Sequence, residues 1–304
     1  MPVEEKLRKG FGQPPSGVER ARDRAAAVKA RAERISERAQ EQRGRHGSID
    51  AVFEVVDRDV EVGGGIIAGA LSYRLFIWLL PLGLVLVGGL GVAAGATSHS
   101  PQEMAGSLGL AGLVASSFKS SAESTASWYA LLVGIPVLII ATRSVLRVLI
   151  GMHRIVWADV RHAAPKPTLS GSVKLLALLL LYFVLAALAS WARSASTALG
   201  LLVTLAVMAG FVGGWLVVSL RLPHRDAARR DLVPGALTVG IGLGLLQIAA
   251  AYLLGPYALA KQGTYGVLGL AAALLFGLFL LGRLIVLGAE LNVTLWERER
   301  RRNG

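Results

Sequence analysis

Six apolar stretches, each long enough to cross a lipid bilayer, constrain the fold of this chain more than any other feature. A transmembrane helix needs about 20 apolar residues, because the hydrocarbon core is roughly 30 Å thick. The stretches occupy residues 63–95, 128–150, 173–190, 198–220, 233–254 and 265–289. Only 17% of the residues are charged, against about 25% in soluble domains. The chain is therefore predicted to be an all-α integral membrane protein with a bundle of six transmembrane helices.

Basic residues between the stretches orient the bundle, because loops rich in Arg and Lys stay on the cytoplasmic side. The second-to-third loop, the fourth-to-fifth loop and the C-terminal tail are basic, through Arg154, Arg161, Lys166, Lys174, Arg221, Arg225, Arg229, Arg230, Arg298, Arg300, Arg301 and Arg302. The alternate loops hold Lys119, Arg193 and Lys261. We expect a multi-pass protein of the cytoplasmic (inner) membrane with both termini in the cytoplasm.

Two segments precede the first apolar stretch. Residues 1–48 mix basic and acidic side chains and are predicted to form a charged cytoplasmic arm, helical or flexible, because opposite charges three apart support a helix. Residues 49–62 place apolar side chains at helical spacing and predict an amphipathic juxtamembrane helix, at the membrane surface or against the bundle. The membrane domain then covers residues 63–292, and a basic cytoplasmic tail covers 293–304.

Charged side chains in or beside the apolar stretches are the main candidates for function, because each costs at least about 2.5–3.5 kcal/mol near the centre of a span. They are Arg74, Arg143, Arg147, Arg283 and Glu290. Two interpretations stay open. In the first, the arginines reach the interface and one ion pair stabilises the bundle. In the second, the four arginines line a headgroup-sized cavity open to the inner leaflet, since guanidinium groups suit phosphate oxygens. In either case Glu290, the only acid near the apolar core, is the expected counter-ion.

Glycines four residues apart predict close helix packing, because small side chains let helices approach in lipid. The expected hinge and packing residues are Pro81, Gly91, Gly95, Gly210, Gly214, Gly240 and Gly244. Pro81 predicts a kink in the first span. The run from Gly240 to Gly244 is superficially similar to a dinucleotide-binding loop, but it lies inside a span with no strand before it, so no cofactor is expected.

Catalytic chemistry finds little support in the sequence. The five histidines are scattered without metal-ligand spacing, the chain has no Cys, and neither a nucleophile elbow nor a phosphate loop occurs. The net charge of +12 lies in loops and termini rather than on one folded surface, so nucleic acid is not an expected partner. We expect no enzyme activity, no metal and no cofactor.

Four motifs, in order, resemble the YihY/BrkB family of bacterial inner-membrane proteins. They are Ala70-Leu-Ser-Tyr-Arg-Leu-Phe-Ile-Trp-Leu-Leu-Pro-Leu82, the segment Ala141–Asp159, Arg221-Leu-Pro223 with Arg230-Asp-Leu-Val-Pro-Gly-Ala236, and Tyr265-Gly266 with Leu287-Gly-Ala-Glu-Leu-Asn292. The resemblance covers roughly residues 50–295. It implies a six-helix membrane protein linked to envelope integrity, in a family associated with lipid or lipopolysaccharide export. An older family label, ribonuclease BN, does not suit this sequence, which lacks an acid cluster for phosphodiester hydrolysis.

These observations together favour a transporter or exporter of lipid, or of another anionic amphiphile, from the cytoplasmic leaflet, with membrane lipids as partners. Two alternatives stay open. One is a scaffold or regulator that does not transport and recruits a cytoplasmic protein through its N-terminal arm. The other is an exporter of ions or small solutes, for which Gln247 and Asn292 are the other strongly polar side chains in the later spans.

Overall fold

The computed structural model describes residues 47–96, 124–158, 166–195, 197–249 and 255–303, together with Ala26. The chain divides into two compact units, Met1–Glu54 and Val55–Gly304, and the second holds the apolar helices. The predicted arm therefore lies almost entirely outside the described residues, as do residues 250–254 of the predicted fifth span.

Every regular element in the described residues is a helix. They are α3 (Gly47–Val62), α4 (Gly64–Ala96), α7 (Ser124–Val156), α8 (Leu169–Ala195), α9 (Thr197–Ser219), the 3-10 turn η1 (Arg229–Leu232), α10 (Val233–Ala249) and α11 (Gly255–Asn303). The prediction of an all-α fold is confirmed for this part of the chain.

Five helical segments in the described residues are long and apolar enough to cross a membrane. They are Gly64–Gly89, Ser127–Val156, Leu202–Ser219, Arg229–Ala249 and Ala271–Asn303. The predicted third span falls in α8, whose shorter apolar stretch is Leu169–Leu185. The chain is thus a multi-pass α-helical membrane protein, and the residues that the structure describes hold five segments of spanning length where six were predicted for the whole chain.

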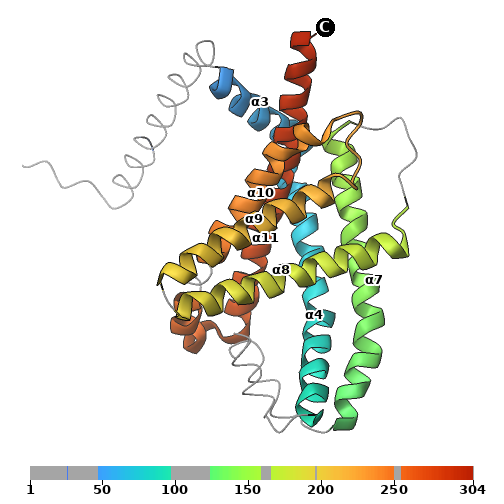
Figure 1. Ribbon diagram of the computed structural model, residues 1–304, viewed down its shortest axis with the longest axis vertical. Helices are drawn as coiled ribbons and strands as arrows, with labels where there is room; N and C mark the ends of the chain where they lie inside the picture. Colours follow the sequence, from blue (N-terminus) through green and yellow to red (C-terminus); the bar gives the residue numbers. More distant parts are fainter. Residues whose placement is uncertain are drawn as a thin grey trace, which may run out of the picture. The chain divides into compact units, whose positions relative to one another are not determined.

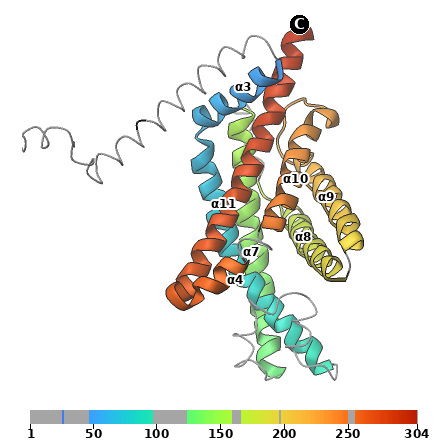
Figure 2. The same cartoon turned by 90° about the vertical axis from the view of Figure 1, so that its left-hand side faces the viewer.

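Three long helices, α4, α7 and α11, run alongside one another, and α8 and α9 cross them obliquely (Figures 1 and 2). Helix α10 packs between α9 and α11. Helix α11 continues unbroken for 49 residues, so the predicted boundary between the last span and the tail is not a helix end. Pro81 lies inside α4, and the second half of α4 leaves at a different angle from the first (Figure 2), because proline removes a helical hydrogen bond.

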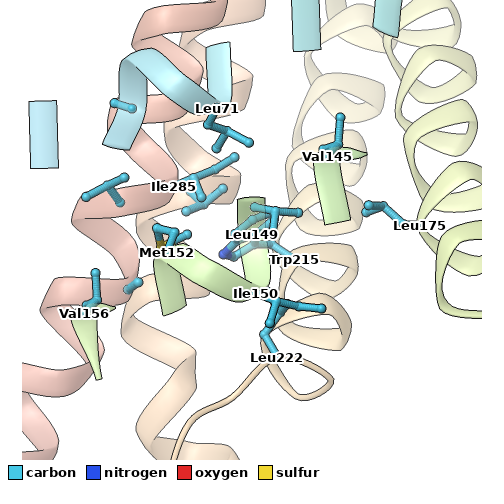
Figure 3. Packing of buried hydrophobic residues seen from close by; sticks show 14 of the residues in the cluster. Leu71, Val145, Leu149, Ile150, Met152, Val156, Leu175, Trp215, Leu222 and Ile285 are labelled. Carbon is cyan, nitrogen blue, oxygen red and sulfur yellow. The ribbon is translucent and has the colours of Figure 1, made fainter. Parts of the chain in front are cut away.

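The core forms where one apolar face of each long helix meets its neighbours (Figure 3). These faces repeat every three or four residues, the spacing that puts side chains on one side of a helix. The buried residues are Leu71, Leu75, Trp78 and Leu82 on α4, Val145, Leu149, Met152 and Val156 on α7, and Ile285, Val286, Ala289 and Val293 on α11.

Large apolar side chains also cover the outer surface of these helices. Trp128, Leu132, Leu202 and Leu245 are each more than half exposed. Soluble proteins rarely expose wide apolar surfaces, whereas helices that face lipid do so throughout. Apolar residues around the whole circumference therefore match a bundle embedded in a bilayer.

Candidate functional site

A corner between α3, α4 and α11 brings charged side chains against the bundle. Helix α3 ends at Val62, and Gly63 adopts a left-handed backbone conformation with φ of 68°, which glycine tolerates without steric cost. The chain then enters α4 at Gly64. This turn directs Arg58 and Asp59 toward α7 and α11, while Val56 and Val60 stay exposed. Arg58 and Asp59 therefore face the protein together with the buried Val55, whereas Val56 and Val60 of the expected apolar stripe do not.

Two ion pairs connect α3 with α11 at this corner. Arg283 donates to Asp59 through both guanidinium nitrogens, at 2.6 and 3.0 Å. Arg58 pairs with Glu297 and also donates to the backbone carbonyl of Val156 on α7, at 3.3 Å. All four charged side chains of these pairs are less than a third exposed. The pairs therefore join the start of the second unit to its last helix.

Glu290 lies inside the same corner, on the face of α11 that also carries Arg283. Its side chain is fully buried, and within the described residues neither carboxyl oxygen has a hydrogen-bond partner. The structure thus differs from the expectation that Glu290 pairs with an arginine, because Arg283 binds Asp59 instead. Asp59 is a second acid near the apolar core, where Glu290 was expected to be alone.

Gly64 makes this arrangement of two carboxyl groups sterically feasible. A side chain at this position would overlap Oδ1 of Asp59, and its Cβ would lie 3.0 Å from Oε1 of Glu290. The two acids therefore converge on the space that the missing Cβ leaves free.

The other predicted arginines lie elsewhere, on the outer surface of α4 and α7. Trp78 donates through Nε1 to Thr142 Oγ1 at 2.8 Å and aligns the two antiparallel helices. Arg74 lies one turn from Trp78, about 6 Å along the helix axis, and so is level with Arg143 and Arg147. All three side chains are exposed. The three arginines thus lie at a similar height along the two helices. Arg283 and Glu290 lie apart from them, at the corner with α3.

The predicted packing glycines lie at helix crossings. A Cβ on Gly240 would lie 2.6 Å from the backbone nitrogen of Val212, and one on Gly244 would lie 2.5 Å from Met208 Cγ, both on α9. Gly210 and Gly214 face α8, where an added Cβ would lie 3.1 Å from the nearest side-chain atoms. Gly91 would overlap Ser127 on α7 if it carried a side chain. Gly95 belongs to α4.

Asn292, one of the polar side chains considered for a solute path, is used within the fold. It is buried, and its Oδ1 accepts a hydrogen bond from the backbone N–H of Gly235 at 2.6 Å. Gly235 lies in the first turn of α10, where backbone N–H groups have no partner inside the helix. Asn292 therefore caps α10 from α11.

An apolar cavity of about 50 Å³ lies among the helices. Its lining comprises Leu71, Leu75, Val145, Leu149, Leu175, Leu178, Leu179, Tyr182, Trp215, Leu243, Leu281 and Ile285. None of the predicted arginines lines it. It is not the basic headgroup cavity that the sequence suggested.

Comparison with known families decides the membership of the chain. The family model described as Virulence factor BrkB matches residues 58–304. The chain belongs to the BrkB family. The match begins at Arg58, so it includes the whole corner around Glu290, and it confirms the resemblance seen in the sequence motifs. Comparisons with curated proteins and with solved structures gave no significant match.

Sequence reasoning did not identify Asp59 as part of this site. It lies among other acids on a short amphipathic helix, and its hydropathy pattern resembles that of its exposed neighbours. Three glycines at positions 63–65 were the available signal. They indicate a tight turn, and such a turn brings the end of α3 close to the first residues of α4.

Proposed function

We propose that this BrkB-family protein is a transporter without enzyme activity that binds an anionic lipid, or another anionic amphiphile, at the cytoplasmic leaflet and exports it. The observation that carries the proposal is the row of Arg74, Arg143 and Arg147, which are level with one another on the outside of α4 and α7. In the described part of the chain, neither Arg143 nor Arg147 forms an ion pair. Their guanidinium groups are available to phosphate.

The surroundings of these arginines suit an amphiphile. Ile77 and Ile140 are exposed apolar side chains one turn from Arg74 and Arg143. A guanidinium group offers several donors to phosphate oxygens, while neighbouring apolar side chains contact acyl chains. Long basic side chains near the end of a span also reach the headgroup region with little cost.

The basic loops support the orientation that this function needs. We infer the cytoplasmic membrane, both termini in the cytoplasm and α8 as the sixth span, because this arrangement leaves the basic loops inside. In that orientation the three arginines face the inner leaflet. A role in envelope integrity would follow from export of an envelope lipid.

Lipid movement in proteoliposomes tests the proposal. We expect the wild type to move fluorescent phosphatidylglycerol, and the double variant Arg143→Gln/Arg147→Gln to move it at least tenfold more slowly. Lys174→Gln, at an exposed basic residue of α8, is the matched control and should retain the wild-type rate. Equal rates in the wild type and the double variant would overturn the arginine site.

A folded wild type that moves no lipid would overturn transport altogether. In that case the scaffold hypothesis predicts that residues 1–48 capture a cytoplasmic protein, and deleting these residues would abolish function while the arginine variants would not.

A further inference from the structure

The buried carboxyl group of Glu290 has no role in the proposed lipid site. It is fully buried, and both oxygens lack a hydrogen-bond partner among the described residues. Burying an ionised carboxylate without a partner is costly, and such groups either pair, bind a cation or become neutral. Glu290 has no such pair among the described residues, which leaves a bound cation or a neutral carboxyl group.

The charged groups facing Glu290 are Asp59, Arg283 and Arg58. Each already has a partner of opposite charge. Arg283 uses two nitrogens on Asp59, and Arg58 is paired with Glu297. Arg225 also approaches Glu297, at 4.0 Å. These contacts engage Asp59 and Glu297, and the carboxyl oxygens of Glu290 have no hydrogen-bond partner among the described residues.

The geometry around Gly64 also favours a proton on Glu290. Oδ1 of Asp59 and Oε1 of Glu290 both lie within 3.0 Å of the position that a Cβ on residue 64 would occupy. Two carboxyl groups that share one site do not both ionise, and they retain a proton between them. A proton on Glu290 neutralises its buried carboxylate and requires no extra volume.

A metal ion fits this cluster less well. Within the described residues, no group of three or more His, Cys, Asp or Glu side chains gathers. Hard cations such as Ca²⁺ take six or more oxygen ligands, whereas here one of the two carboxyl groups is already bound by Arg283.

We propose that Glu290 is a proton-binding site at the corner of α3, α4 and α11. In the observed arrangement the carboxyl group is neutral. When the contact between Asp59 and Arg283 opens, Glu290 becomes open to water, releases its proton to a water molecule and forms hydronium and a carboxylate. Closure of the contact requires the reverse transfer, from hydronium to the carboxylate. The Asp59–Arg283 contact is thereby linked to one proton. This inference does not depend on lipid binding.

Infrared spectroscopy of the full-length protein in lipid nanodiscs tests the site directly. We expect the wild type at neutral pH to show the C=O stretch of a protonated carboxyl group. This band should be lost in Glu290→Gln and retained in Glu61→Gln, a matched change at an exposed acid of α3. Absence of the band in the folded wild type, or its persistence in Glu290→Gln, would overturn the proposal.

Asp59→Asn gives a second test that keeps Glu290 in place. Without Asp59, Arg283 loses its carboxylate and becomes free to pair with Glu290, which then ionises. The band should therefore disappear in this variant too, and this result decides the matter if Glu290→Gln does not fold. A wild-type band that falls as sodium is raised at constant pH would instead assign the site to a metal cation and overturn proton binding.

Discussion

Arg283 on α11 donates two hydrogen bonds to Asp59 on α3, and the two residues are 224 positions apart in the chain. Their side chains are 26% and 17% exposed. This pair brings the juxtamembrane helix against the last helix and lies beside the buried carboxyl group of Glu290.

Replacing Arg283 should destabilise the protein much more than replacing an exposed arginine. Arg283→Gln leaves Asp59 partly buried without its partner, and we expect the free energy of unfolding to fall by about 2–3 kcal/mol. Arg230→Gln breaks the exposed pair with Glu299 and should cost less than about 1 kcal/mol. Denaturant unfolding in detergent, followed by tryptophan fluorescence, measures both. Equal losses would show that the Asp59 pair contributes no more than a surface contact.

Asn292 and Thr294 should respond in opposite ways to loss of their polar atoms. Asn292→Ala leaves the Gly235 N–H without its acceptor and should cost about 1–3 kcal/mol. Thr294 Oγ1 is buried without a hydrogen-bond partner in the described residues, so Thr294→Val should be neutral or stabilising. Unfolding midpoints of the two variants test this contrast, and a loss in Thr294→Val comparable to that in Asn292→Ala would refute it.

The turn into α4 predicts a difference between two nearby glycines. Gly63→Ala forces an alanine into the left-handed conformation and should destabilise by about 1–2 kcal/mol. Gly65 lies within helix α4, where a Cβ would meet no other atom within 4 Å, so Gly65→Ala should stabilise by about 0.5–1 kcal/mol. Thermal unfolding in the same detergent compares them. A stabilised Gly63→Ala variant would contradict the turn geometry.

The crossing of α9 and α10 predicts a similar contrast inside the membrane. Gly240→Ala places a methyl group against the backbone of Val212 and should cost about 1–3 kcal/mol, because the helices must separate. Gly213→Ala, on α9 with open space around it, should not destabilise. If both variants unfold at the wild-type midpoint, close contact at Gly240 is disproved.

The apolar spans could be predicted from sequence because hydropathy is a local property. The segments of α4, α7, α9, α10 and α11 each contain the run of apolar residues that a bilayer demands. The predicted third span, residues 173–190, is not confirmed, because the apolar stretch of α8 in the described residues, Leu169–Leu185, is shorter than a span.

The pairing of charges could not be predicted in the same way. Arg283 and Glu290 lie two turns apart on one face, which made them natural partners, but side chains on one helix compete with those of every helix packed against it. The turn at Gly63 decides the outcome by delivering Asp59 to Arg283. Exposure of Arg143 and Arg147 likewise depends on which side of α7 meets α4, and one helix considered alone does not contain that information.

The distance in sequence between Asp59 and Arg283 also sets an order of events during biosynthesis. At about 5–20 residues per second, a ribosome needs tens of seconds to make the residues that separate them, and throughout that time Asp59 has no Arg283 to bind. The corner closes when the last helix has entered the membrane. A chain that stalls or is truncated before α11 lacks the partners of Arg58 and Asp59, and both charges then stay without their ion pairs.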